Sequence, residues 1–581
     1  MKKSLKKRGQ KIIKRFSRFN QRAEIKGKEH IKENFLGRLS HIKDIKILIF
    51  EWGLLVFALI MLAITQSIWF GNSYSTSAFV SGDTYTEGTI GRVNSMNPLF
   101  ATTDSEKALS RLLFSNLATI DYSGNIGGGL ASTIRKSENG RIWTIKLREN
   151  LKWSDGEPIT NEDVIFTTSL IKNSSAATVY DSNLSGVKVT ELETGEIEFA
   201  LPSIYADFDT MLNFPIVPKH ILGVADPKTL VEHSFSTNPI TSGAFTFNAT
   251  QNTSAEDEKI IYLSANPYYY KGKPLLDSFA IHAYSNKDAL IKGLNSGKIT
   301  ATAALTPSES SLVTSSVMQE KQTAVGSGVY AFLNTSSANL KNKSFRRAIK
   351  RAVDLEAVRA AAPSEPILDY PFVSSQIKLS HYPELLAHDS EAAAGVFDKL
   401  LDEAGEAGIH LNIATVNAGY MPAVAEAFAN ELRSYGLDVS VTPYDENQDF
   451  IGSVISKRNY DILIYKIELG VDPDVFPYYH SSQASKSGLN LSNFKNSIVD
   501  ELILGARETT DNALRVAKYE SFLDYWVDEV PAIGLYQTNM SYFFNKNVRT
   551  FSDDSHFISP FDRFVNVENW AAEKTTKNRT P

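Results

Sequence analysis

Hydrophobic and polar positions divide the chain into a short N-terminal part and a long remainder. Residues 52–70, WGLLVFALIMLAITQSIWF, contain no charged side chain. As a helix rising about 1.5 Å per residue, this run is long enough to cross a hydrocarbon core roughly 30 Å thick. Trp52, Trp69 and Phe70 stand at its two ends, where interfacial aromatic residues are expected. The pattern predicts a transmembrane anchor over 47–70, and a buried helix of a globular domain is the alternative.

Beyond residue 85, segments in which hydrophobic residues recur every two positions alternate with segments in which they recur about every 3.6 positions. Apolar and polar residues alternate over 141–148, which predicts a half-buried strand. Apolar residues recur every three or four positions between Val516 and Val530, which predicts a helix ended by Pro531. These mixed signals predict a multi-lobed α/β protein. Further helices are expected over 391–404 and 421–435, and further strands over 411–416, 439–442 and 461–466.

Composition and charge narrow the class of protein. The chain has 581 residues, 43% hydrophobic and 22% charged, which is globular composition with more than one core. It has no cysteine, which excludes disulfides, thiolate metal sites and a lipid-modified N-terminal cysteine. Residues 1–46 carry a net charge of +12 and the rest carries −18. A basic head on an acidic body argues against a nucleic-acid-binding protein.

The charge distribution also predicts the sidedness of the anchor. The basic side of a membrane span stays in the cytoplasm, so we expect the N-terminus inside the cell and residues from Gly71 onward outside. A head of 46 basic-rich residues is longer than an ordinary signal-peptide n-region, which favours an uncleaved anchor over cleavage near Ala78. The head either lies on anionic lipid or only sets the topology.

No motif in the sequence indicates catalysis or metal binding. The ten histidines are scattered, and HExxH, GxSxG and phosphate-loop motifs are lacking. Residues 121–127 resemble the start of a calcium loop, but Ile126 stands where such a loop needs glycine, so we interpret them as a turn. We therefore predict no enzyme, no metal and no cofactor.

A series of short motifs, in a fixed order, carries a family resemblance. The most specific covers residues 143–164: a strand, a W-S-D-G-x-P turn over 153–158 and the opening of a helix. The chain resembles the oligopeptide/dipeptide-type (family 5) extracellular solute-binding proteins of ABC importers over roughly residues 85–550. The other matching segments are 95–99, 113–117, 218–220, 241–245, 266–272, 344–354, 472–474, 480–482 and 506–531.

The resemblance implies a fold and a division into domains. It implies a two-lobed periplasmic-binding-protein-like clamp of type II with an extra subdomain and with the ligand held at the hinge. The apolar run at 52–70 places this clamp behind an N-terminal transmembrane helix. The expected parts are a basic cytoplasmic head (1–46), an anchor (47–70), a tether (71–84), lobe I (85–116, 235–333 and 535–570), an extra subdomain (117–234), lobe II (334–534) and a polar tail (571–581).

The resemblance also implies ligand contacts. Peptide-binding relatives hold the ligand as an extra strand between two backbone segments. Counting from the matching motifs places these segments on 102–104 and 465–467, with an aromatic strand at Tyr330 and Phe332 beside them. The full set of predicted substrate-binding residues is Thr102, Thr103, Asp104, Tyr330, Phe332, Tyr465, Lys466, Ile467 and Glu468.

One position departs from the pattern of the relatives. Relatives that bind a peptide α-amino group carry an aspartate seven residues before the phenylalanine that is Phe476 here, and this chain has Leu469 there. Three possibilities remain open: Glu468 binds the amine, the amine is not bound at this place, or the ligand is not a free-amine peptide. Asp472 is interpreted as part of the D-P-D turn at 472–474.

The leading functional hypothesis is a monomeric, membrane-anchored extracellular protein that captures oligopeptides or a similar solute for an ABC permease. The alternative is a receptor of the same fold that senses or scaffolds without transport. A hydrolase on this fold is disfavoured, because the sequence offers neither a nucleophile constellation nor a metal motif.

Overall fold

The computed structural model describes residues 46–80, 84–121, 125–180, 184–253, 258–373, 375–445, 448–552, 555 and 557–578. Nearly all of the predicted basic head lies outside the described residues. The chain forms two compact units. One comprises residues 1–78 and 574–581, and the other comprises Phe79–Glu573.

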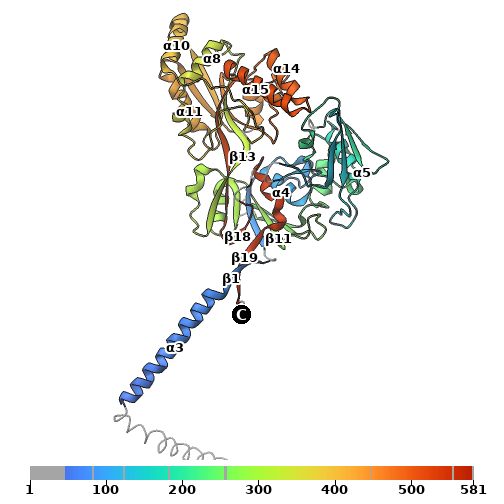
Figure 1. Ribbon diagram of the computed structural model, residues 1–581, viewed down its shortest axis with the longest axis vertical. Helices are drawn as coiled ribbons and strands as arrows, with labels where there is room; N and C mark the ends of the chain where they lie inside the picture. The colour runs from blue at the N-terminus through green and yellow to red at the C-terminus, as the bar shows by residue number, and fades with distance from the viewer. Residues whose placement is uncertain are drawn as a thin grey trace, which may run out of the picture. The chain divides into compact units, whose positions relative to one another are not determined.

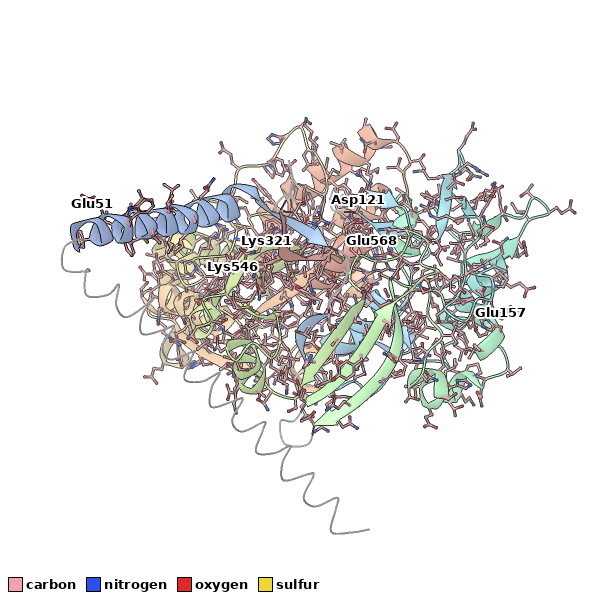
Figure 2. The ribbon with its side chains drawn as sticks, turned by 90° about the horizontal axis from the view of Figure 1, so that it is seen from below. Glu51, Asp121, Glu157, Lys321, Lys546 and Glu568 are labelled. Atoms are coloured by element: carbon pink, nitrogen blue, oxygen red, sulfur yellow. The ribbon has the colours of Figure 1, made fainter. Side chains whose placement is uncertain are left out.

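The described part of the first unit is mainly the helix α3 (Lys46–Tyr74), which is followed by the strand β1 (Ser75–Val80). Large apolar side chains between Phe50 and Ile64 are exposed along it, and Figure 2 shows them around the helix near Glu51. The helix continues four residues past the predicted end at residue 70. Among the described residues, no helix qualifies as long and apolar enough to cross a membrane.

A ten-stranded sheet organises the second unit (Figure 1). Its order is β15-β14-β16-β13-β17-β12-β2-β11-β10-β9. Strand β11 is buried at six of its seven positions, as expected for a central strand covered on both faces. The bounds are β2 (Thr84–Ile90), β9 (Phe245–Thr253), β10 (Glu258–Ala265), β11 (Ser278–Tyr284), β12 (Ala301–Leu305), β13 (Met318–Leu333), β14 (His410–Val416), β15 (Asp438–Tyr444), β16 (Ile462–Glu468) and β17 (Ala532–Asn545).

Two long antiparallel strands, β13 and β17, connect two separate hydrophobic cores. Their pairing is irregular between Ala324 and Gly328. On β13, Val325 belongs to one core and Val329 to the other. On β17 the same change occurs between Tyr536 and Met540. The strands thus cross from one lobe to the other where their register breaks, which is a natural place for a hinge.

Helices cover both lobes and confirm the periodicity of the sequence. The helix expected to end at Pro531 is α15, and those expected over 391–404 and 421–435 are α10 and α11. Figure 1 shows α8, α10, α11, α14 and α15 at one end of β13. The helices are α4 (Asp104–Leu113), α5 (Asn161–Ile171), α6 (Lys219–Leu222), α7 (Lys287–Asn295), α8 (Lys343–Ala352), α9 (Leu355–Arg359), α10 (Ser390–Ala404), α11 (Met421–Arg433), α12 (Gln448–Phe450), α13 (Phe476–Tyr479), α14 (Ser497–Arg507) and α15 (Asn512–Glu529).

A separate four-stranded sheet contains the most specific motif of the sequence. The strand expected at 141–148 is β6, and the turn after it brings the Trp153 amide to the carbonyl of Glu157, 2.8 Å away. Gly156 takes φ +96°, a conformation that favours glycine. Asp163 then accepts a 2.9 Å hydrogen bond from the Thr160 amide and caps α5. The sheet has the order β5 (Ala131–Lys136), β6 (Ile142–Leu147), β8 (Ile197–Ala200) and β7 (Lys188–Glu191).

The remaining strands lie outside these two sheets. They are β3 (Thr119–Ile120) paired with β4 (Ile126–Gly127), and β18 (Val548–Arg549) paired with β19 (Ala571–Asn578).

Candidate functional site

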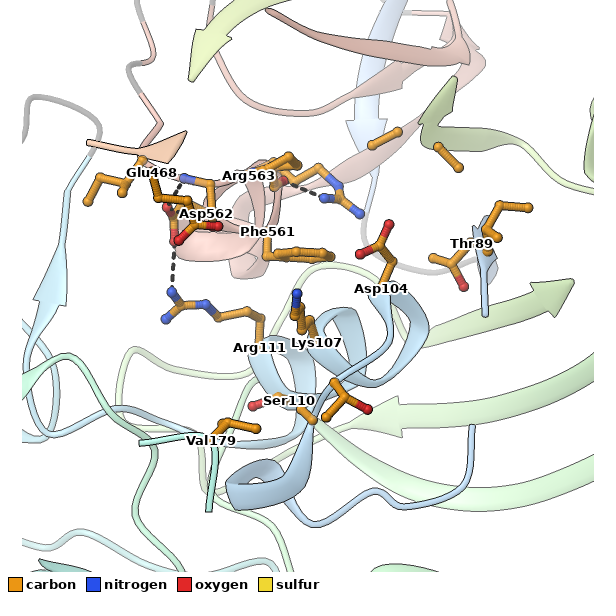
Figure 3. A pocket seen from close by; sticks show the side chains of 18 of the residues that line it. Thr89, Asp104, Lys107, Ser110, Arg111, Val179, Glu468, Phe561, Asp562 and Arg563 are labelled. Carbon is orange, nitrogen blue, oxygen red and sulfur yellow. Dashed lines mark hydrogen bonds and ion pairs between the residues drawn. The ribbon is translucent and has the colours of Figure 1, made fainter. Parts of the chain in front are cut away.

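A cavity of about 710 Å³ lies where segments far apart in the sequence converge (Figure 3). This volume is within the range of small-ligand sites. One wall consists of α4 and the 3-10 helix η11 (Pro560–Asn569). The end of β16 supplies another wall, and the loop at 179–180 closes one side. Because β16 belongs to the lobe II core and α4 to the other core, the two lobes share the cavity.

The start of α4 is fixed by a dense hydrogen-bond network. Glu106 is 2% exposed and accepts the backbone amides of Thr102 (3.0 Å), Thr103 (3.1 Å) and Asn94 (2.9 Å). The Ser95 amide is a further donor at 3.2 Å. Burial opposes its charge, but these amide donors outweigh burial and lower the pKa of Glu106. Glu106 therefore holds α4 firmly in place and is not free to bind a ligand.

The same network changes the expectation for residues 102–104. These residues cap and begin a helix instead of continuing as a strand, and the amides of Thr102 and Thr103 already donate to Glu106. A ligand strand that lay along 102–104 would therefore find no free backbone amide at Thr102 or Thr103. Of the three residues, Thr102 and Asp104 line the cavity and Thr103 caps α4.

The end of β16 offers an open backbone edge. The pairing of β16 with β14 covers only Ile462–Ile464, whereas its pairing with β13 continues to Glu468. In the described part of the chain, no strand pairs with 465–468 on the β14 side. The Glu468 carbonyl does accept a hydrogen bond from Tyr478. The side chains of Lys466 and Glu468 face the cavity, and Ile467 between them is buried.

Two of the predicted residues lie in the core and not at the cavity. Tyr330 and Phe332 are both 0% exposed, and the Tyr330 hydroxyl donates to the carbonyl of Tyr370 at 3.0 Å. Burial raises the pKa of Tyr330. The prediction that they line the pocket is wrong for this structure, because β13 is a central strand covered on both faces. Tyr465 is half-buried, with its ring 5.9 Å from that of Phe450, and does not line the cavity either.

The aspartate position of the relatives is also structural here. Leu469 is 6% exposed, and its amide donates to the carbonyl of Gly326 at 2.7 Å. In the turn that follows, Asp474 lies 3.3 Å from Arg507, and Asp472 accepts a 2.9 Å hydrogen bond from Tyr205. Burial raises the pKa of both aspartates, and their proximity adds to the shift of Asp472. Glu468 is thus the acid of this segment that faces the cavity.

Charged residues that the sequence did not reveal complete the site. Arg111 of α4 forms a 2.9 Å ion pair with Asp562 of η11, and Arg563 is paired with the buried Glu87. Lys107 is a further cavity residue on α4. The spacing of Asp104, Lys107 and Arg111 puts them on one helix face opposite buried Leu109 and Leu113, which is a detectable signal. Nothing local in the sequence connects α4 with η11.

Comparison with known proteins agrees with this architecture. The family model for bacterial extracellular solute-binding proteins, family 5 (middle region), matches residues 125–488. The oligopeptide-binding protein AppA of Bacillus subtilis is 24% identical over 508 residues, covering 83% of this chain and 90% of AppA. The probable D,D-dipeptide-binding periplasmic protein DdpA of Escherichia coli is 24% identical over 461 residues, covering 74% and 82%.

Solved structures show the same fold. AppA of Bacillus subtilis in complex with a nonapeptide superposes with a TM-score of 0.68 at 23% identity, over 86% of this chain and 100% of AppA. The substrate-binding protein CtaP of Listeria monocytogenes gives a TM-score of 0.74 at 21% identity, over 85% of this chain and 99% of CtaP. These likenesses confirm the expected α/β two-lobed periplasmic-binding-protein-like fold, and the family model confirms a binding protein instead of an enzyme. The chain therefore belongs to family 5 of the bacterial extracellular solute-binding proteins.

Proposed function

We propose that this protein is a membrane-anchored extracellular receptor that binds oligopeptides in the cavity and delivers them to the permease of an ABC importer. The observation that carries the proposal is the strand end at 465–468, which has no strand partner on the β14 side in the described part of the chain and whose Lys466 and Glu468 line a cavity shared by two lobes. A peptide can add to such an edge as an extra strand, because main-chain hydrogen bonds are independent of the peptide's side chains. The names of AppA and DdpA, which describe peptide binding, agree with it.

In the proposed mechanism, the ligand brings the two lobes together. Lobe I comprises 85–116, 235–333 and 535–570, lobe II comprises 334–534, and the extra subdomain comprises 117–234. The register break of β13 and β17 provides the hinge. A peptide at 100 times its dissociation constant should stabilise the fold by about 2.7 kcal/mol, provided that it does not bind the unfolded chain. A broad peptide library that produces no shift in melting temperature would refute peptide binding.

The anchor belongs to the same proposal. Its support is the uncharged run at 52–70, the +12 head before it and the exposed apolar side chains of α3. Protease added to intact cells should digest the binding domain and spare the head. Release of the domain by processing near Ala78 would contradict an uncleaved anchor.

Glu468 is proposed to bind the peptide amine. Glu468→Gln keeps the shape of the side chain and removes its charge. Loss of one partner of a buried charge pair costs about 3–5 kcal/mol, so affinity for a free-amine peptide should fall by about 100-fold or more, at about 1.4 kcal/mol per tenfold. The exposed Glu501→Gln, on α14, is the matched control. Equal affinities of wild type and Glu468→Gln for both free-amine and N-acetylated peptides would exclude this role.

Delivery to a permease is a separate step and needs a separate experiment. Cells that lack the protein should lose uptake of a labelled peptide, and the full chain should restore it. Peptide binding without any effect on uptake would favour the alternative, a receptor that senses or scaffolds without transport.

A further inference from the structure

The cationic residues around the cavity differ in whether a carboxylate of the protein already pairs with them. Arg111 is paired with Asp562 at 2.9 Å and also lies 3.3 Å from the Asn213 side-chain oxygen. Arg563 is paired with Glu87. Lys107 lines the cavity on the same helix as Arg111, and no ion pair or hydrogen bond involves its ammonium group in the described part of the chain.

Lys107 projects from a rigid support. Ala108, Leu109, Leu112 and Leu113 are all 0% exposed and fix the opposite face of α4 in the core. The Lys107 Nζ lies 5.8 Å from the centre of the Phe561 ring, and Figure 3 shows the ammonium group directed into the cavity beside that ring. The aromatic ring excludes water from one side of this cation, which strengthens its attraction for an anion.

We propose that Lys107 is the anchoring cation for a carboxylate of the bound ligand, so that the cavity selects peptides that carry an anionic group. This assignment rests on the proposed peptide-binding function and deepens it. Arg111 and Arg563 are poor candidates, because each would have to give up a carboxylate that it already binds. A carboxylate that meets Lys107 gains a charge-assisted hydrogen bond without breaking one in the protein.

Lys466 is the other cavity lysine, and its position makes it less suitable. It lies two residues from Glu468 on β16, so both side chains point to the same face of the strand. A ligand amine at Glu468 would be close to Lys466 and would gain nothing from it. Lys107 lies on the α4 wall, across from β16. A dipolar ligand can therefore place its amine at β16 and its carboxylate at α4.

The experiment uses the full chain and three probes: tetra-alanine, its C-terminal amide, and the same amide with one internal alanine replaced by glutamate. Binding is measured by calorimetry for wild type, Lys107→Met, Lys107→Arg and, for comparison, Lys466→Met at the other cavity lysine. The control is Lys292→Met, at an exposed lysine of α7 that does not line the cavity. Lys107 is exposed, so these variants should fold normally, and circular dichroism checks this.

We expect Lys107→Met to weaken binding of a carboxylate-bearing probe at least tenfold and binding of the plain amide less than twofold. Lys107→Arg should stay within a few-fold of wild type. A loss confined to tetra-alanine identifies the terminal carboxylate, and a loss confined to the glutamate peptide identifies a side-chain carboxylate. The assignment to Lys107 would be overturned if Lys107→Met lowered the affinity for all three probes equally. It would also be overturned if Lys466→Met lowered the affinity for the same probes by the same factor. In both cases peptide binding itself would stand. A wild-type protein that binds none of the probes would overturn both proposals.

Discussion

Glu87 and Arg563 form a buried ion pair whose arginine lines the cavity, and we predict that removing the charge of Glu87 strongly destabilises the folded chain. Glu87 is 0% and Arg563 1% exposed. Glu87 accepts hydrogen bonds from the Arg563 guanidinium, with 3.1 Å to its Nε, and from the Tyr542 hydroxyl at 2.9 Å. The pair thereby joins β2, β17 and η11. Glu87→Gln removes the carboxylate charge from a buried ion pair, and breaking a buried pair by removing one partner typically costs about 3–5 kcal/mol.

Urea denaturation followed by tryptophan fluorescence can measure this loss, because Trp570 packs in the same core, 5.4 Å from the Tyr85 ring. The matched control is Glu162→Gln. Glu162 is 67% exposed and pairs with Lys219 at 2.9 Å, so the same substitution should cost at most about 1 kcal/mol there. A Glu87→Gln variant no less stable than this control would refute the reasoning.

Two further predictions concern backbone packing and pH. A Cβ at Gly243 would lie 2.4 Å from the Leu112 carbonyl oxygen, so Gly243→Ala should destabilise the fold. A Cβ at Gly395 in α10 would have no atom within 4 Å, so Gly395→Ala should stabilise the fold by up to about 1 kcal/mol. Thermal melts in which both variants shift the melting temperature in the same direction would contradict this. Burial raises the pKa of Asp472, so the folded chain binds more protons than the unfolded chain between about pH 4 and the raised pKa. The free energy of unfolding should therefore fall as the pH rises through this window, by up to about 1.4 kcal/mol per pH unit. Asp472→Asn should reduce the change of the urea midpoint with pH across this window. If the urea midpoints of the variant and the wild type change equally with pH, Asp472 is not the cause of the pH dependence.

Local signals explain why most elements were predictable from the sequence. The alternation at 141–148 and the helical period before Pro531 depend on which face of one element is buried, so the observed β6 and α15 agree with them. The turn at 153–158 was predictable because its glycine and aspartate act within a few residues. Tyr330 and Phe332 were misplaced for the opposite reason, since burial of β13 on both faces depends on elements that are distant in the sequence.

The cavity was predictable only in part. Two of the residues reached by counting from the motifs, Lys466 and Glu468, line the cavity. It could not show that Glu106 engages the amides of Thr102 and Thr103, because a capping network depends on three-dimensional placement. The partners Arg111 and Asp562 are 451 residues apart, and no local pattern connects them.

The division of the cavity between two cores has a consequence for selectivity. A ligand can shift an equilibrium between open and closed lobes only by the difference in its affinity for the two states. A solute that contacts β16 alone would bind both states equally well and would leave the lobes free. In the proposed mechanism, a ligand stabilises closure only if it reaches both the β16 edge with Glu468 and the α4 wall with Lys107. In this proposal the charges of the two walls select ligands by length and polarity, whereas main-chain pairing at 465–468 is independent of the intervening side chains.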